Sequence, residues 1–324
     1  MAELSEILDK HKARLLALPG CTGVAIGYKE VKGEVIDQLA IIVFVKRKQP
    51  NVAADHLVPQ ALDGTPTDVI EKTFGFTLTA TDPFARFPQL IGGLSITPHD
   101  AAPVWGSLGC VIHTTGNAHV PHAGDYLLSN HHVLTYADPA NPNSTTRAVI
   151  QPGKADEPPP ANYSCGDYVW GQTTQTSDCA ITTIGAGRTW RNQVPNHPLR
   201  PGNRTLRGIA VAAVGDEVYK YGATTKSTRG VVRFTNYTPH LLPIQNSIYV
   251  ENADGTMWVA KGDSGSVLIR YSDDFVVGLN FAADETTMLA HHPTLPNDLP
   301  AYSAGYAYDI QSQMNLFGGV VRLA

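Results

Sequence analysis

The first eighty residues combine one helical run of apolar positions with alternating, strand-like segments. Between residues 3 and 17 apolar side chains recur near helical spacing, and a Pro-Gly pair stops the run. Three strands and one short helical piece are predicted to follow, the strands over residues 21–31, 37–48 and 66–74 and the helical piece over residues 51–62. The pattern predicts a small α/β domain over residues 1–80.

The pattern changes from residue 90 onward. Short segments of strand-forming residues alternate with clusters of Gly, Pro, Asn and Asp, which is typical of an antiparallel barrel or sandwich. Residues 185–208, rich in Pro, Asn and Arg, are interpreted as a connector between two halves, and residues 309–317 look helical. We therefore expect a second, mainly β domain over residues 81–324.

Composition narrows the possible functions. The 324 residues are 43% hydrophobic and 16% charged, with a net charge of −5, which argues against a nucleic-acid partner because such proteins need a basic face. No apolar run is long enough to span a bilayer, and the N-terminal residues lack the pattern of a secretory signal. We expect a cytoplasmic protein with no membrane partner, and its four cysteines to be free thiols.

One stretch indicates chemistry. "KGDSGSVL", residues 261–268, places a serine on a glycine-rich turn before strand-forming residues, but turns of this composition are common. A nucleophilic serine needs a base and a group that orients the base. "YLLSNHHVL", residues 126–134, offers two histidines, and "SDCAITTI", residues 177–184, offers an aspartate. The order His, Asp, Ser is one of the three known for this triad.

These motifs resemble those of chymotrypsin-fold serine proteases, especially their bacterial branch. "LLSNHHVL" is similar to the family's histidine motif, "SDCAI" to its aspartate strand and "GDSGS" to its serine loop, from which Ser266 departs at the last position. "TPTDVIE", "LIGGLSI" and "YGATTKSTRGVV" further resemble bacterial trypsin-like proteins related to the plant Narrow-leaf proteases, which also carry a small N-terminal α/β unit. The protease resemblance covers roughly residues 90–310.

The resemblance implies a fold and a set of roles. The fold would be a chymotrypsin-like double β-barrel, with six strands in each barrel, behind the small α/β domain. Ser264 would attack the acyl carbon, His132 would accept its proton, and Asp178 would orient His132. The backbone N–H groups of Gly262 and Ser264 would form the oxyanion hole. His131 is the rival base, and Asp167 is the rival acid.

A substrate pocket is also implied, lined by Trp258, Lys261, Phe281, Ala282 and Ala283. Trp258 would form its floor, where tryptic relatives have an aspartate, so we expect no preference for Arg or Lys. Asp284 and Glu285 could reach the pocket if the register shifts. No cofactor or metal is expected, and His113, His119 and His122 are interpreted as surface residues.

"LIGG", residues 90–93, resembles the new N-terminus that activation releases in secreted relatives, where the freed amine pairs with the aspartate before the serine. We interpret it here as a glycine turn that enters a strand, so no activating cleavage is expected. Asp263 would then need another partner, which the sequence does not name.

The sequence thus predicts a serine endopeptidase acting on protein or peptide substrates. Two alternatives stay open: an esterase that uses the same triad, and a non-catalytic scaffold on a protease fold. The N-terminal domain lacks triad members, and its strands could pair between subunits, which makes a homo-oligomer possible.

Overall fold

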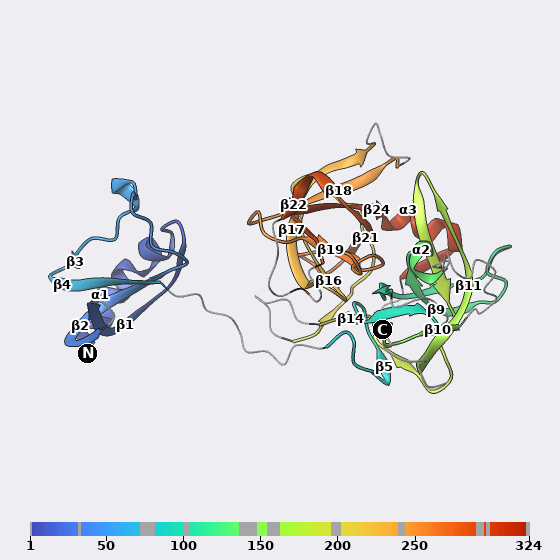
Figure 1. Ribbon diagram of the computed structural model, residues 1–324, viewed down its shortest axis with the longest axis horizontal. Coiled ribbons are helices and arrows are strands. Elements are labelled where there is room, and N and C mark those ends of the chain that lie inside the picture. Colours follow the sequence, from blue (N-terminus) through green and yellow to red (C-terminus); the bar gives the residue numbers. More distant parts are fainter. Residues whose placement is uncertain are drawn as a thin grey trace. The chain divides into compact units, whose positions relative to one another are not determined.

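The computed structural model describes residues 2–31, 34–71, 82–99, 104–135, 148–153, 163–195, 202–238, 244–289, 295 and 299–321 (Figure 1). The chain divides into two compact units, Met1–Thr77 and Leu78–Ala324. The boundary predicted between residues 80 and 81 lies outside the described residues. Each unit is described by itself below.

The N-terminal unit is a four-stranded sheet with one helix. Its elements are α1 (Ala2–Leu16), β1 (Cys21–Val31), β2 (Glu34–Val45), the 3₁₀ turn η1 (Ala54–His56), β3 (Ala61–Leu62) and β4 (Thr65–Glu71). The strand order is β1-β2-β4-β3; β1 and β2 are antiparallel, whereas β2 and β4 are parallel. Leu15 of the helix packs on Ile41 and Val43 of β2, which makes this helix–sheet contact the core of the unit.

The helical piece predicted over residues 51–62 is wrong beyond one turn. Only Ala54–His56 is helical, and β3 occupies the end of the predicted segment. Pro59 explains the difference, because a proline disfavours helical backbone in the residue before it. At the other edge of the sheet β1 leaves Tyr28 and Val31 exposed, at 52% and 43%. The role of this unit in assembly stays a prediction.

The first half of the second unit is an open, eight-stranded sheet in the order β25-β8-β9-β12-β11-β10-β6-β7. Its strands are β6 (Ser95–Pro98), β7 (Gly106–Ser107), β8 (Cys110–Thr114), β9 (Gly124–Ser129), β10 (Ala148–Ile150), β11 (Ser164–Thr174), β12 (Ser177–Thr182) and β25 (Gly319–Val321). Among the described residues this sheet does not close, so the six-stranded closed barrel expected here is wrong in detail. β25 comes from the C-terminal end of the chain and pairs with β8, so this edge is covered by an added strand instead of by closure.

The second half is a closed barrel in the order β16-β17-β18-β24-β21-β20. Its strands are β16 (Glu217–Gly222), β17 (Lys226–Tyr237), β18 (Ser247–Asn252), β20 (Val267–Arg270), β21 (Val276–Ala283) and β24 (Ala304–Asp309). Inward side chains such as Val218, Val232 and Leu268 fill it. One closed barrel beside a half-barrel confirms the predicted mainly β, chymotrypsin-like fold in its overall form.

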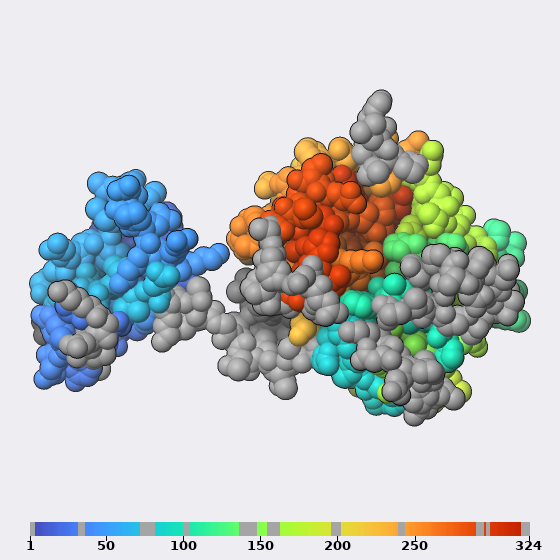
Figure 2. Space-filling view, viewed as in Figure 1, coloured from blue at the N-terminus to red at the C-terminus, as the bar shows by residue number. Residues whose placement is uncertain are grey.

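A shared apolar core joins the two halves. The helix α3 (Ile310–Phe317), predicted from the sequence, follows β24 directly and contributes Ile310, Met314 and Phe317 to a cluster with Leu128 of β9 and Leu279 of β21. Asp309 caps the helix by accepting a hydrogen bond from the Ser312 N–H, and Gly318 ends it in the left-handed region, with φ of 59°. The helix therefore fixes the two halves against each other. On the face seen in Figure 2, the orange atoms of the second half lie next to the green and cyan atoms of the first half.

Short strands complete this unit. They are β5 (Gln89–Leu90), β13 (Thr189–Trp190), β14 (Gln193–Val194), β15 (Arg204–Thr205), β19 (Val259–Ala260), β22 (Met288–Leu289) and β23 (Ala301–Tyr302), together with the 3₁₀ turn η3 (Glu285–Thr287). β13, β14 and β15 lie within residues 185–208, the segment interpreted as a connector, and β5 pairs with β13. The connector is therefore more regular than predicted. Among the described residues, no helix has both the length and the apolar character needed to cross a bilayer.

The four cysteines are free thiols, as predicted, and they differ in burial. Burial raises the pKa of Cys110 and of Cys165 to about 12 and raises the pKa of Cys179 further. Cys21 in the N-terminal unit is only partly buried. Because the thiolate is the reactive form, the three buried thiols are poor nucleophiles.

We predict that an aromatic disulfide reagent at pH 8 modifies Cys21 of the native protein well before the other three cysteines. A thiol with a pKa near 12 is ionised in roughly one molecule in ten thousand at that pH. Peptide mapping after timed quenching measures the order of modification, and unfolding in guanidinium should equalise the four rates. Fast modification of Cys179 in the folded chain would contradict the burial described here.

Candidate active site

The loop between β19 and β20 carries Ser264 between two glycines that no other residue can replace easily. Gly262 and Gly265 have φ of 99° and 93°, in the region that side chains disfavour. A Cβ on Gly262 would also collide with the indole of Trp105, and one on Gly265 would collide with the backbone of Ser107. The loop therefore needs glycine on both sides of Asp263-Ser264 to lie this close to the first half.

His132 and Asp178 are in direct contact. β9 ends at Ser129, the one-turn helix α2 (His131–Leu134) follows, and the Nδ1 atom of His132 hydrogen-bonds to Oδ2 of Asp178 on β12. The other carboxylate oxygen, Oδ1, accepts hydrogen bonds from the His132 backbone N–H at 3.1 Å and from the Thr173 hydroxyl at 3.3 Å. The Asp178 side chain is only 7% exposed, whereas that of His132 is 46% exposed. The carboxylate thus holds the Nδ1 edge of the imidazole, while nearly half of the His132 side chain stays exposed.

The two alternative residues, His131 and Asp167, make other contacts. The Nδ1 atom of His131 lies 3.1 Å from the Thr173 hydroxyl, and burial lowers its pKa, an effect that Asp178 opposes. Asp167 lies on β11 with an exposed side chain, and its backbone N–H donates to the hydroxyl of Thr183. Neither residue has the contact that joins His132 to Asp178.

Ser264 and His132 line one cleft, but the serine hydroxyl donates to the carbonyl of Phe281, at 3.1 Å. A rotation about its Cα–Cβ bond would redirect that hydroxyl. Within the described parts of the chain, the backbone N–H groups of Gly262 and Ser264 have no acceptor. Their carbonyls are occupied, since Gly262 O accepts from the Ser107 hydroxyl and Ser264 O from the Ser107 N–H, at 2.9 and 2.7 Å. The loop therefore leaves two N–H donors available beside the serine.

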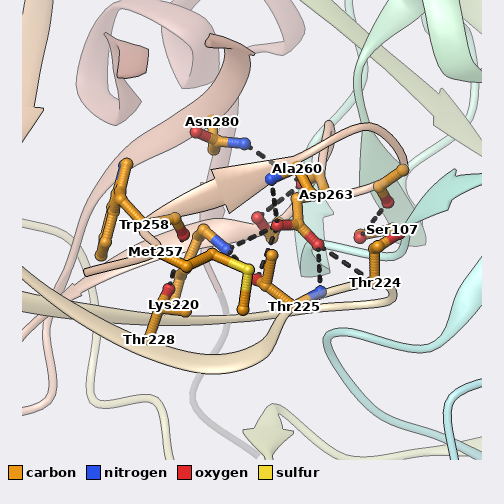
Figure 3. Close-up of polar contacts among 12 residues, drawn as sticks. Ser107, Lys220, Thr224, Thr225, Thr228, Met257, Trp258, Ala260, Asp263 and Asn280 are labelled. Carbon is orange, nitrogen blue, oxygen red and sulfur yellow. Dashed lines mark hydrogen bonds and ion pairs between the residues drawn. The ribbon is translucent and has the colours of Figure 1, made fainter. Parts of the chain in front are cut away.

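Asp263 has the partner that the sequence did not name. Its carboxylate and the ammonium of Lys220 on β16 lie 2.9 Å apart, and both side chains are fully buried (Figure 3). Burial lowers the pKa of Lys220, and the Asp263 carboxylate opposes this shift. The carboxylate also accepts hydrogen bonds from the N–H groups of Thr224, Thr225 and Ala260, each at 3.0 Å. The Thr225 hydroxyl completes the set at 2.6 Å.

"LIGG" has a different place in the fold. Leu90 is fully buried, and β5 pairs with β13 in the parallel direction. The N–H of Gly92 donates to the carbonyl of Gln193, and Gly93 has φ of 85°. The segment is a glycine turn between β5 and β6, and Asp263 is satisfied without an amine from this part of the chain.

The residues predicted to form the substrate pocket separate into two groups. Trp258 is fully buried in the barrel core with Val232 and Leu268, and its ring centroid lies 5.3 Å from the Lys220 ammonium. It is not among the residues that line the cleft. Lys261 is exposed and does line the cleft.

The other three predicted pocket residues end β21. Phe281 is partly buried and stacks on Tyr308, with ring centroids 4.1 Å apart, and Ala282 and Ala283 are also partly buried. β20 pairs with β21 only as far as Leu279, whereas β24 continues to pair with Ala282 and Ala283. One backbone edge of residues 281–283 is therefore unpaired with any described strand.

The cleft beside Ser264 was not predicted in this form. Its volume is about 120 Å³, and it is lined by Thr97, Val104, Trp105, His132, Val133, Lys261, Gly262 and Ser264. The first half of the unit supplies the apolar wall, in which Val133 belongs to the histidine motif but Val104 and Trp105 belong to no catalytic motif.

No protein-family model matches the chain, and no curated protein matches it. Among solved structures the chain is similar to a glutamic acid specific serine protease described as using a histidine triad in substrate binding, at 17% identity and a TM-score of 0.48, over 72% of this chain and 100% of that one. It is also similar to Cellulomonas bogoriensis chymotrypsin, at 17% identity and a TM-score of 0.48, over 73% and 100% of the two chains. Thermobifida fusca protease A gives 14% identity and a TM-score of 0.47, over 73% and 100%. At these identities the likenesses assign no role to any residue of this chain.

We predict that Lys220→Met lowers the free energy of unfolding by about 3–5 kcal/mol, because it leaves the Asp263 carboxylate buried without its counterion. The double variant Lys220→Met/Asp263→Asn should lose clearly less than the sum of the two single losses. Urea unfolding followed by tryptophan fluorescence measures all three variants.

The matched control for this experiment is Arg233→Met. Arg233 and Glu251 lie 2.7 Å apart, but their side chains are 49% and 41% exposed. Its loss should stay below about 1 kcal/mol. Equal effects of Lys220→Met and Arg233→Met would mean that the buried pair does not support the loop.

Proposed function

We propose that this protein is a serine endopeptidase that uses Ser264, His132 and Asp178. The observation that carries the proposal is the contact of both Asp178 oxygens with His132, on a cleft that His132 shares with Ser264. The backbone N–H groups of Gly262 and of Ser264 itself have no described acceptor. A nucleophile, a base and an oriented acid are the parts that acyl transfer requires.

In the proposed reaction, the Ser264 hydroxyl leaves the Phe281 carbonyl and turns toward the Nε2 atom of His132. The imidazole takes the proton as the oxygen attacks the carbonyl carbon, and Asp178 stabilises the resulting imidazolium. The N–H groups of Gly262 and Ser264 bind the oxyanion, an interaction worth about 3–4 kcal/mol when one donor is removed. His132 then protonates the leaving amine, and water releases the acyl group by the reverse sequence.

A peptide substrate is favoured over a simple ester by the unpaired edge of β21. Ala282 and Ala283 pair with β24 on one side, Phe281 lies at the irregularity just before them, and none of the three has a described strand on the other side. An extended peptide can add to such an edge through backbone hydrogen bonds, which position its carbonyl relative to the serine. Small esters lack these groups and would gain nothing from that edge.

We predict that the intact, uncleaved chain reacts covalently with a fluorophosphonate at Ser264 and at no other residue. His132 and Asp178 are already in contact, Ser264 needs only a side-chain rotation to reach His132, and Lys220 already neutralises Asp263. Peptide mapping by mass spectrometry locates the label, and the Ser264→Ala and Asp178→Asn variants serve as controls. Label on a different residue would contradict the proposal, and reaction only after cleavage before Leu90 would contradict the expectation that no activation is needed.

We also predict that cleavage does not favour Arg or Lys before the scissile bond. The pocket proposed from the sequence contains no carboxylate, and a cation, Lys220, already lies beside the ring of Trp258. Asp284 is engaged by the hydroxyl of Tyr249 at 2.8 Å and by that of Thr286 at 2.7 Å. A buried cation without a partner carboxylate costs several kcal/mol.

A positional-scanning peptide library measures this preference, with Ser264→Ala as the blank for contaminating proteases. Dominant cleavage after Arg or Lys would mean that Asp284 or Glu285 reaches the pocket, as the alternative register requires.

A further inference from the structure

The cleft beside Ser264 has one rigid apolar wall. The indole N–H of Trp105 donates to the Thr224 hydroxyl at 3.0 Å, and that hydroxyl donates to the Lys261 carbonyl at 2.7 Å. Phe84 packs edge-on against the same indole, with ring centroids 5.3 Å apart. The indole is therefore fixed in orientation from two sides, and Val133 adds a further apolar surface to the cleft.

The position of the cleft indicates which part of a substrate it receives. The acyl side of a peptide is assigned to the free edge of β21, and no residue of 281–283 lines the cleft. The cleft instead contains His132, the group that protonates the leaving amine, and residues from the first half of the unit. A peptide that crosses the reaction centre from β21 therefore continues into this cleft on its leaving-group side.

The size and charge of the cleft restrict what it can hold. A cavity of 150 Å³ is known to accept benzene, so about 120 Å³ suits a branched aliphatic side chain better than an indole. Among the described residues no carboxylate lines the cleft, and Lys261 contributes an exposed ammonium that has no ion-pair partner among them. An acidic group is thus favoured near the rim, and a basic one is disfavoured.

We propose that this cleft is a leaving-group subsite that selects a branched aliphatic residue directly after the scissile bond and an acidic residue next to it. Trp105 determines the first preference and Lys261 the second. The inference rests on the proposed peptidase function. It states that the first half of the second unit recognises the substrate residues that follow the scissile bond.

Acyl transfer tests the subsite without any knowledge of the acyl-side preference. p-Nitrophenyl acetate acetylates Ser264 with release of p-nitrophenolate, and water or an added amine then attacks the acetyl carbon. The amine forms an amide, and the Ser264 oxygen leaves and regains its proton from His132. The ratio of amide to acetate therefore reports how well each amine binds on the leaving-group side.

We expect leucine amide to give a ratio about tenfold higher than glycine amide, because its side chain would be buried against Trp105. Among dipeptides, Leu-Asp should exceed Leu-Lys by a few-fold, since the pair with Lys261 is exposed. Trp105→Ala should bring leucine and glycine amides close together, and Trp105→Phe, which keeps a ring, should fall between. Lys261→Glu should reverse the order of Leu-Asp and Leu-Lys.

Arg191→Glu is the matched control for the charge change. Arg191 is also exposed and does not line the cleft, so this variant should keep the wild-type order of the dipeptides. Equal ratios for all amines on an enzyme that is normally acetylated would overturn the subsite and leave the peptidase proposal intact. Absence of acetylation at Ser264 would instead reject the proposed function and the subsite with it.

Discussion

The buried ion pair between Lys220 and Asp263 is the constraint on which the candidate site depends. Isolated, either charge would be very costly inside the barrel, and the pair is tolerable because four further hydrogen bonds complete the carboxylate. Three of these donors are backbone N–H groups, so the same carboxylate ties the segment before Ser264 to the turn at Thr224 and Thr225. The Lys220–Asp263 pair and these hydrogen bonds thus hold the serine loop in its conformation.

This arrangement gives the Asp263 carboxylate a counterion from within the barrel. In the protease family that the motifs resemble, an amine released by cleavage pairs with the equivalent aspartate. Here an ammonium is supplied from within the barrel by β16, and the "LIGG" segment is built into β5 and its turn. The internal counterion and the paired "LIGG" segment are consistent with each other, because Lys220 already occupies the counterion position 2.9 Å from the buried Asp263 carboxylate.

The sequence could predict the parts of the site that are local in the chain. The motifs around His132, Asp178 and Ser264 are short, so each is readable from its neighbours. The strand and helix patterns place β1 and α3 correctly and place β2 three residues too far along the chain. Lys220 could be found only by noticing that it shares a strand face with the inward Val218. Its partner lies far along the chain, and single-sequence periodicity contains no record of such a pair.

The same reasoning applies to the motif-based assignment of the pocket floor, because a motif does not give the surroundings of a side chain. Position 258 was assigned by its distance from the serine, but side-chain direction depends on how the strand enters the barrel. The Trp258 N–H pairs with the Tyr302 carbonyl, and its side chain lies in the barrel core beside Lys220. An aspartate at this position would lie beside that ammonium and compete with Asp263 for it. The lysine that supports the serine loop therefore also restricts what the adjacent position can be, and tryptophan, with a ring that attracts a cation, is compatible with it.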